Sequence, residues 1–359
     1  MQSVRGDSTV ERGMLVAQLL AGSWRSEPPP TSTSPEELAD IATLLLKSGS
    51  GGLAWNKIRH SALRDSHAAR EFQKAYRLHS LQAALHERSL KKVLPLLRDC
   101  GVEPLLVKGW ATARLYPELG LRPYSDLDFC VLPEDYAKAQ AALKSSERLE
   151  CDVDLHSGFG KFYDRRTEDI FARSRLIRLG DLDVRVLSAE DDLRFLCVHL
   201  LRHGAARPLW LCDIAVMLET LDDNFDWDVC LGGSRRQADW VACAIALARE
   251  LLGAEMDRTP FAKSTRKVPK WMLSAVLEEW AVPYYMPAQF SYYLRRPLTN
   301  FRALLKEMPK HWPNPIEATV TVRGPFNGLP RLPFQVGHVF SRAASLVANL
   351  PKSFRPVKS

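Results

Sequence analysis

The sequence lacks several features that mark common classes of protein. Its seven cysteines form no C-x-x-C pair, and most of them lie within apolar runs. We therefore expect reduced, buried thiols rather than a disulfide framework or a zinc site. No apolar run approaches the roughly 20 residues that span a bilayer, and the apolar stretch Met14–Ala21 lacks a signal-peptide cleavage site. These absences predict a cytoplasmic protein without a transmembrane segment.

Charge is distributed unevenly along the 359 residues, which carry a net charge of +7. Residues 257–359 contain 16 Lys/Arg and 5 Asp/Glu, a net charge of +11, so the rest of the chain is mildly acidic. The first expectation for this basic region is a solvated surface. The second is attraction to a phosphate-rich partner such as nucleic acid or an anionic membrane.

Capping and breaking residues divide the chain into regions. Ser34-Pro35-Glu36-Glu37 is a capping box that predicts a helix to Lys47, ended by the Ser/Gly run at 48–52. Apolar residues at helical spacing predict a long helix from about Ser66 to Asp99. We expect four regions: an N-terminal helical extension (1–65), an α/β core (66–188), a helical domain (189–256) and a basic, partly helical C-terminal region (257–359).

The core region contains short segments typical of strands. Residues 105–107, 127–132 and 151–156 are apolar or alternating, and 175–187 predicts a hairpin that turns at Gly180-Asp181. Further helices are predicted at 190–203, 208–221, 235–253, 269–280 and 334–350. The pattern indicates an α+β fold with N-terminal helices and a mostly helical C-terminal part.

Asp126 and Asp128 are the first candidate site residues. Separated by two positions at the start of a predicted strand, they point to the same face, where their charges repel unless a cation lies between them. Mg²⁺ is commonly held by one or two carboxylates together with substrate phosphates. The pair therefore predicts a phosphoryl or nucleotidyl transfer site, and the alternative is a solvated surface strand.

A second metal requires a third carboxylate. Asp154 can supply it if its strand pairs beside the first, but Asp152 lies on the same strand face, so spacing alone leaves the choice open. Asp181 and Asp183 repeat the Asp-x-Asp pattern at a predicted turn, where a structural role is the simpler interpretation.

Two basic residues precede the aspartates. Lys108-Gly109 follows a short apolar strand, where glycine permits close approach to a triphosphate and the next helix offers its N-terminus. Lys108 can act as a point charge for a phosphate and Arg122 as a clamp on the loop that leads into the aspartates. For each of the two, a solvated surface side chain is the alternative.

Three residues of the predicted helical domain are candidates for a substrate pocket. His199 and His203 share a helix face, but the Glu of an H-E-x-x-H zinc motif is absent, so pocket or core histidines are favoured over metal ligands. Asp213 is an acid within an apolar run, which predicts a basic partner either in the core or at the pocket.

Four short motifs together resemble one known pattern. They are Leu106-Val107-Lys108-Gly109-Trp110-Ala111, Arg122-Pro123-Tyr124-Ser125-Asp126-Leu127-Asp128-Phe129, Val153-Asp154-Leu155-His156 and Trp210-Leu211-Cys212-Asp213-Ile214. In order and spacing, over about residues 65–220, they resemble an uncharacterised bacterial nucleotidyltransferase family of the DNA polymerase β-like superfamily. The resemblance implies that 66–188 is a minimal nucleotidyltransferase core, a small mixed sheet with packed helices.

The resemblance also implies roles for particular residues. Asp126, Asp128 and Asp154 are expected to be catalytic metal ligands for Mg²⁺ or Mn²⁺, with Asp154 favoured over Asp152 because the D-L-H motif begins there. The remaining implied residues are nucleotide-binding Lys108, Gly109, Arg122 and Ser125, and pocket residues His156, His199, His203 and Asp213. In one departure, Trp110 occupies the position at which the superfamily usually has a phosphate-binding serine.

The implied activity is transfer of a nucleoside monophosphate from an NTP, ATP among the expected donors, to a hydroxyl or phosphate acceptor. A peptide natural product or polysaccharide precursor is an expected kind of acceptor, because such gene clusters often accompany the family. The alternative is a catalytically degenerate nucleotide- or peptide-binding protein, for which Trp110 is the argument. Nucleic-acid modification through the basic region is a third and weaker hypothesis.

Overall fold

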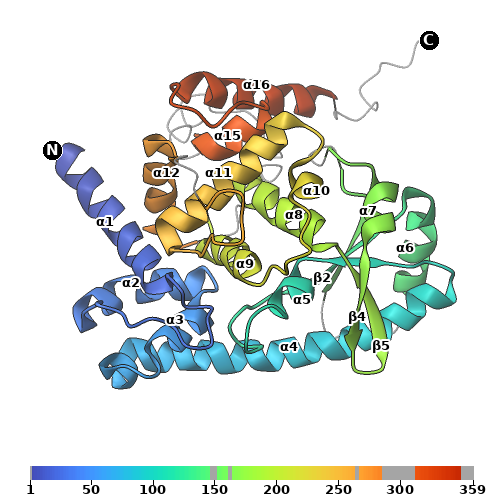
Figure 1. Ribbon diagram of the computed structural model, residues 1–359, viewed down its shortest axis with the longest axis horizontal. Helices are drawn as coiled ribbons and strands as arrows, with labels where there is room; N and C mark the ends of the chain where they lie inside the picture. Colours follow the sequence, from blue (N-terminus) through green and yellow to red (C-terminus); the bar gives the residue numbers. More distant parts are fainter. Residues whose placement is uncertain (1, 146–151, 161–163, 263–266, 285–311, 349–359) are drawn as a thin grey trace, which may run out of the picture.

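The computed structural model describes residues 2–145, 152–160, 164–262, 267–284 and 312–348. Three expectations fall partly outside these residues: the strand start at Cys151, the end of the last predicted helix, and much of the basic C-terminal region. The predicted α+β class is confirmed, because a five-stranded mixed sheet is packed with helices (Figure 1).

The sheet has the strand order β3-β2-β1-β5-β4. Its strands are β1 (Leu105–Val107), β2 (Asp126–Val131), β3 (Asp152–Ser157), β4 (Arg175–Leu179) and β5 (Leu182–Val186). β1 pairs antiparallel with β2 and parallel with β5, whereas β3 pairs parallel with β2. β4 and β5 form the predicted hairpin, and Gly180 occupies its turn with φ +64°.

The two faces of the sheet are covered differently. One face packs on α4 (His67–Asp99) and α6 (Tyr136–Ser145), with Leu106 and Phe129 buried among apolar side chains of α4. The other face carries Val107 and Cys130 and is covered by α7 (Thr167–Arg173) and α8 (Ala189–Arg202). Because alternate strand residues share a face, Asp126 and Asp128 lie on this second face, beyond its apolar cover.

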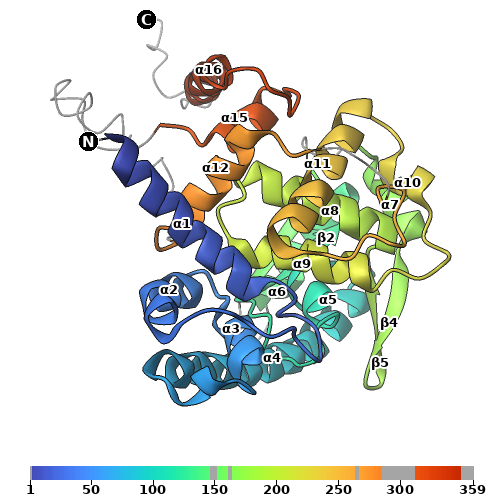
Figure 2. The same ribbon diagram turned by 60° about the vertical axis from the view of Figure 1, so that its left-hand side comes forward.

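Helix α4 extends along much of the molecule (Figures 1 and 2). Its N-terminal part packs on the preceding helices and its C-terminal part on the sheet. The prediction of a helix from about Ser66 is confirmed, and the Ser66 hydroxyl caps the first turn by accepting a hydrogen bond from the Ala69 amide. The helix therefore links the sheet to the rest of the fold.

The N-terminal helices are α1 (Gln2–Leu20), α2 (Pro35–Lys47) and α3 (Gly51–Ile58). The predicted capping box at Ser34 and Glu37 is confirmed by hydrogen bonds in both directions. The Ser/Gly run ends α2 as predicted, but α3 begins within it. Gly52 packs so closely that a Cβ would lie 2.2 Å from the Gly120 carbonyl oxygen, so tertiary packing sets this helix start where local propensity predicts a break.

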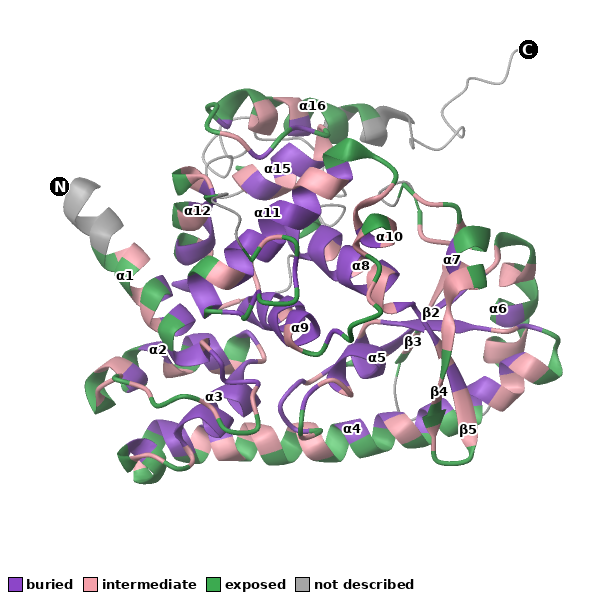
Figure 3. Cartoon of the chain, in the orientation of Figure 1, coloured by how far each residue is buried: buried purple, intermediate pink, exposed green. Residues whose placement is uncertain are grey.

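One large hydrophobic core joins these N-terminal helices to the later ones. The later helices are α9 (Pro208–Glu219), α10 (Trp227–Leu231), α11 (Arg235–Leu252), α12 (Lys270–Trp280), α15 (Pro315–Thr321) and α16 (Leu332–Ala348). Figure 3 shows that α8, α9 and α11 are largely buried, whereas α16 lies at the surface. The helices predicted at 190–203, 208–221 and 235–253 are confirmed to within two residues at each end. Three short helices complete the described elements: η1 (Ala62–Asp65), α5 (Gly109–Ala113) and η2 (Pro133–Asp135).

Candidate active site

The register of β2 and β3 brings four aspartates together on one face. Asp128 lies opposite Asp154, and Asp126 lies opposite Asp152, because the two strands run parallel and in step. The next same-face residue of β2, Cys130, is buried in the apolar cover of the sheet. The carboxylates thus stand at the N-terminal end of β2, just where that cover stops.

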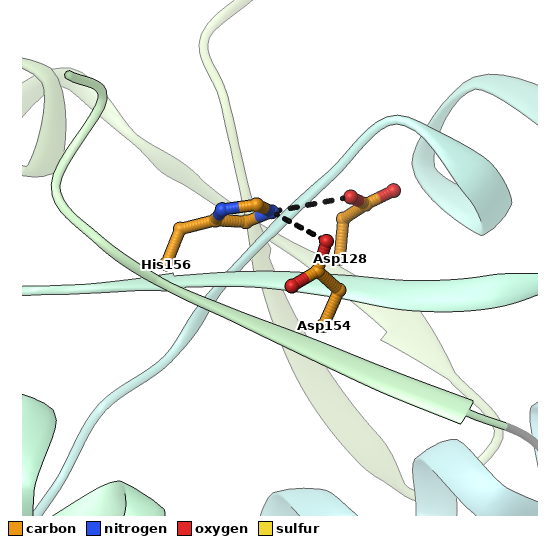
Figure 4. Close-up of side chains that lie close together, drawn as sticks. All are labelled: Asp128, Asp154 and His156. Atoms are coloured by element: carbon orange, nitrogen blue, oxygen red, sulfur yellow. Dashed lines mark hydrogen bonds and ion pairs between the residues drawn. The ribbon is translucent and has the colours of Figure 1, made fainter. Parts of the chain in front are cut away.

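Asp128, Asp154 and His156 form a cluster with the spacing of a metal site. One ligand atom from each lies within 4.8 Å of the others. The His156 Nε2 atom is 3.4 Å from Asp128 Oδ1 and 3.3 Å from Asp154 Oδ2 (Figure 4). Two carboxylates and an imidazole are a donor set that suits Mn²⁺ and related divalent cations, with the carboxylates also suited to Mg²⁺. Among the described residues, this is the one group of at least three Asp, Glu, His or Cys side chains with the spacing of a metal site.

The charges around Asp128 balance one another. Asp128 is buried, with 6% of its surface exposed, and Lys108 Nζ donates a hydrogen bond of 2.9 Å to its Oδ1. Burial raises the pKa of Asp128, but the hydrogen bond to His156 and the charge of Lys108 outweigh it, so its pKa is lowered overall. The hydrogen bond to Asp128 in turn raises the pKa of His156. Two basic groups therefore occupy the positions around Asp128 that face the cluster.

Asp126 stands beside this cluster rather than within it. Its carboxylate is not one of the three groups that lie within 4.8 Å of one another, and Ser125 Oγ donates a hydrogen bond of 3.3 Å to it. Burial and then the charge of Asp128 raise the pKa of Asp126. A cation between Asp126 and Asp128 relieves this repulsion, so the pair fits a divalent ion.

The Lys108-Gly109 turn has an unusual backbone. Both residues have positive φ angles, 54° and 45°, and for a lysine this conformation costs on the order of 1–3 kcal/mol. A Cβ on Gly109 would lie 3.4 Å from the Asp126 carbonyl oxygen, an ordinary contact, so it is the positive φ rather than lack of space that favours glycine here. Helix α5 has only five residues, so we assign anion attraction here to the Lys108 ammonium rather than to a helix dipole.

A cleft of about 290 Å³ opens beside the aspartates. Its walls come from α4, the turn after β1, the loop before β2, the helix α8 and the start of α9. The residues that line it are Gln82, Lys108, Gly109, Arg122, Pro123, Tyr124, Ser125, Asp126, Asp128, His199, Arg207 and Trp210. It is therefore a polar cleft with three cationic side chains and the Asp-x-Asp pair at one end.

Arg122 reaches the cleft but is held by Asp213. Its Nη2 and Nε donate hydrogen bonds of 2.8 and 3.1 Å to the two oxygens of Asp213, and Tyr116 donates a third of 2.8 Å. Burial lowers the pKa of Arg122, but the charge of Asp213 outweighs this and raises it overall. The predicted basic partner of Asp213 is thus Arg122, and the pair fixes the loop before β2 to α9.

His199 in α8 and His203, the residue that follows this helix, lie differently. His199 lines the cleft, and its ring packs against Trp210 at a centroid distance of 4.9 Å. Burial, and then the charges of nearby basic groups, lower the pKa of His199 well below its usual value, so the ring is neutral. His203 packs 4.6 Å from His199 but does not line the cleft.

A scan against models of protein families matches an uncharacterised nucleotidyltransferase family at residues 34–148 and 145–253. The chain belongs to this nucleotidyltransferase family. Comparisons with curated proteins and with solved structures give no significant match. The matched span covers α2 and α3, the whole sheet and the helices through α11, so it contains every residue that lines the cleft.

In this nucleotidyltransferase, Trp110 leaves the cleft open. Its side chain is buried against α4, where the indole Nε1 donates a hydrogen bond of 3.0 Å to Glu87 Oε1. It is not one of the residues that line the cleft. The side chain of Trp110 therefore does not fill the cleft.

Five residues that line the cleft were not predicted as site residues from the sequence: Gln82, Pro123, Tyr124, Arg207 and Trp210. Pro123, Tyr124 and Trp210 lie inside the recognised motifs but had no role assigned to them, and Gln82 is a polar residue inside a long helix, which carries no local signal. Arg207 directly precedes Pro208, the first residue of α9. A basic residue at the start of an apolar helix is a weak signal that could have identified it. Among the described residues, no helix has the length and hydrophobicity needed to cross a membrane.

Proposed function

We propose that this nucleotidyltransferase transfers a nucleoside monophosphate from an NTP to a hydroxyl or phosphate acceptor in a reaction that requires a divalent metal. The observation that carries the proposal is the cluster of Asp128, Asp154 and His156 at the end of a cleft lined by cations. Membership of the family supports nucleotidyl transfer in general. The preferred metal is Mg²⁺, with Mn²⁺ as the alternative.

In the proposed site, Asp128 and Asp154 hold the metal, and Asp126 shares it from the cleft side. Bound there, a divalent cation neutralises phosphate charge and lowers the pKa of an attacking hydroxyl. Lys108, which is paired with Asp128 at 2.9 Å, would be available to pair with a phosphate oxygen if Asp128 served as a metal ligand. Ser125 and the Gly109 backbone line the same stretch of the cleft and orient the triphosphate.

Asp154 is the residue proposed to receive the acceptor proton. Its side chain is 56% exposed, on the outer strand of the sheet, so a hydroxyl can approach it from solvent. His156 contacts it at 3.3 Å and holds its orientation. An acceptor that enters from this side is compatible with a small molecule, a peptide or a glycan precursor.

The degenerate, non-catalytic alternative rested on Trp110. Trp110 is buried against α4 and does not enter the cleft, so the replacement of a serine by tryptophan leaves room for a triphosphate beside Lys108. The cluster of Asp128, Asp154 and His156 and the cleft beside it support an active enzyme, because together they offer a place for a divalent cation next to one for a triphosphate.

The test is thermal stabilisation by each of the four NTPs, with and without Mg²⁺, of the wild type and of Asp126→Asn. We expect a Mg²⁺-dependent increase in Tm with at least one NTP, lost in the variant. An NTP that stabilises both proteins equally, or only without Mg²⁺, contradicts the proposal.

A further inference from the structure

Arg207 is a cation of the cleft that, among the described residues, forms no ion pair with a carboxylate. It lines the cleft together with Lys108 and Arg122. Lys108 is paired with Asp128, and Arg122 is paired with Asp213. Within the part of the chain that the structure describes, no acidic side chain forms an ion pair with Arg207. Of the three cations that line the cleft, Arg207 is therefore the one without an ion pair among the described residues, and its charge is available to a ligand.

The Arg207 side chain is held in place. Its Nε atom donates a hydrogen bond of 2.6 Å to the Ser48 carbonyl oxygen. Its guanidinium carbon lies 5.8 Å from the centroid of the Trp210 ring and 5.6 Å from that of Tyr284, so cation–π contacts fix it from two directions. Because this side chain is already ordered, the binding of a ligand to its guanidinium costs little side-chain conformational entropy.

The loop between α2 and α3 is shaped around this side chain. A Cβ on Gly49 would lie 2.3 Å from Arg207 Nη2, closer than atoms can approach. Gly49 also has φ +79°, a conformation that side chains rarely adopt. The loop in the N-terminal helical region thus supplies both a hydrogen-bond acceptor and the space that Arg207 occupies.

The surroundings of Arg207 favour an anion. Burial, and then the charge of Arg122, lower the pKa of Arg207, and the charges of Tyr284, Asp213 and Asp126 offset this only in part. Arg207 also immediately precedes α9, a helix of 12 residues whose N-terminus carries partial positive charge. A bound phosphate relieves the repulsion and satisfies the guanidinium.

We infer that Arg207 is a phosphate-binding residue of the nucleotide site and that the Ser48–Gly49 loop positions it. The inference rests on the proposed function. It gives the two arginines separate tasks. Arg122, saturated by Asp213, fixes the loop before the aspartates, whereas Arg207 binds oxygens of the triphosphate that lie away from the reacting α-phosphate.

Affinity measurements on variants of Arg207 test this inference. Arg207→Met keeps an apolar stem between the two rings, and Arg207→Lys keeps the charge. Arg202→Ala is the control, because Arg202 is exposed at the end of α8 and does not line the cleft. Calorimetric titrations use inorganic tripolyphosphate, the NTP that binds the wild type best with Mg²⁺, and the corresponding nucleoside monophosphate.

We expect Arg207→Met to weaken binding of the NTP and of tripolyphosphate by about 10- to 100-fold, as loss of a charge-assisted hydrogen bond predicts. The monophosphate should bind with little change, Arg207→Lys should lie between, and Arg202→Ala should resemble the wild type. Gly49→Ala should act in the same direction as Arg207→Met. The Tm of each unliganded variant checks that it is folded.

Two results overturn the inference: unchanged triphosphate affinity in Arg207→Met, or equal losses for the triphosphate and the monophosphate, which indicate a structural role. The proposed function fails separately, if the wild type binds no NTP in the presence of Mg²⁺. In that case, tripolyphosphate binding that depends on Arg207 still supports a phosphate site, and no tripolyphosphate binding rejects it.

Discussion

Asp128 and Asp154 stand opposite each other on two parallel strands, and His156 contacts both. The pairing of β2 with β3 thus selects Asp154 over Asp152 as the acid nearest Asp128. Asp152 lies opposite Asp126, and no described hydrogen bond or ion pair joins it to the cluster. Spacing along the strand left Asp152 and Asp154 as equal candidates for the third acid, and the strand register distinguishes them.

Asp154→Asn and Asp152→Asn form a matched pair, since they make the same change two positions apart on one strand face. We expect Asp154→Asn to lose the Mg²⁺-dependent stabilisation by NTP and Asp152→Asn to keep it, because the cluster contains only the former. The measurement is the shift in Tm at saturating NTP. Loss in Asp152→Asn with retention in Asp154→Asn reverses the assignment.

His156 should affect which metal the site prefers. An imidazole ligand suits Mn²⁺ and later transition metals better than Mg²⁺, which prefers oxygen ligands. We expect His156→Asn to weaken Mn²⁺ binding by at least about 10-fold and Mg²⁺ binding by less, as measured by calorimetry. Equal effects on the two metals would show that His156 only supports the carboxylates.

The buried pair of Arg122 and Asp213 should be important for stability. Asp213→Asn leaves the Arg122 charge buried without a partner, which typically costs about 3–5 kcal/mol of the free energy of unfolding. Asp40→Asn is the control, because the pair of Asp40 with Arg12 is exposed and such pairs contribute about 0–1 kcal/mol. Urea denaturation measures both, and similar losses in the two variants would contradict the account.

The buried carboxyl group of Asp192 should make the free energy of unfolding depend on pH. It is buried at the start of α8, and burial, only partly offset by Arg114 and Arg175, raises its pKa to about 6. Between pH 4 and 6 the folded protein therefore binds the proton that the unfolded chain has released. Stability from this group is full below the unfolded pKa and is lost as the pH rises through about 6.

Asp192→Asn tests this dependence because it removes the titrating group with little change of shape. We expect the variant to gain stability relative to the wild type as the pH rises from 4 to 7, by at most about 3 kcal/mol. The measurement is the free energy of unfolding against pH for both proteins. Parallel curves over this range would show that Asp192 does not titrate there.

The sequence identifies the carboxylates that the structure brings together, but only part of the residues that line the cleft. Asp126, Asp128 and Asp154 are recognisable because strand periodicity and a short motif place them, and the long helix is predicted from its apolar spacing. The contact between Arg122 and Asp213 joins residues 91 positions apart, and no local pattern encodes it.

Packing accounts for the other differences between prediction and structure. The Ser/Gly run before α3 reads as a break, yet Gly51 and Gly52 begin a helix, in which Gly52 packs against the backbone of Gly120 and Gly51 against the side chains of Ala75 and Leu46. Trp110 stands where the resemblance implies a phosphate-binding serine, and Glu87 and the α4 core hold its side chain away from the cleft. In each case a contact distant in sequence decides the outcome.

The most direct test of the central claim is a titration with Mn²⁺ followed by electron paramagnetic resonance. It compares the wild type, Asp128→Asn and Asp152→Asn in the presence of a non-hydrolysable NTP analogue. We predict saturable Mn²⁺ binding in the wild type, its loss in Asp128→Asn and its retention in Asp152→Asn. Equal Mn²⁺ binding in the wild type and Asp128→Asn would contradict the assignment of the metal site.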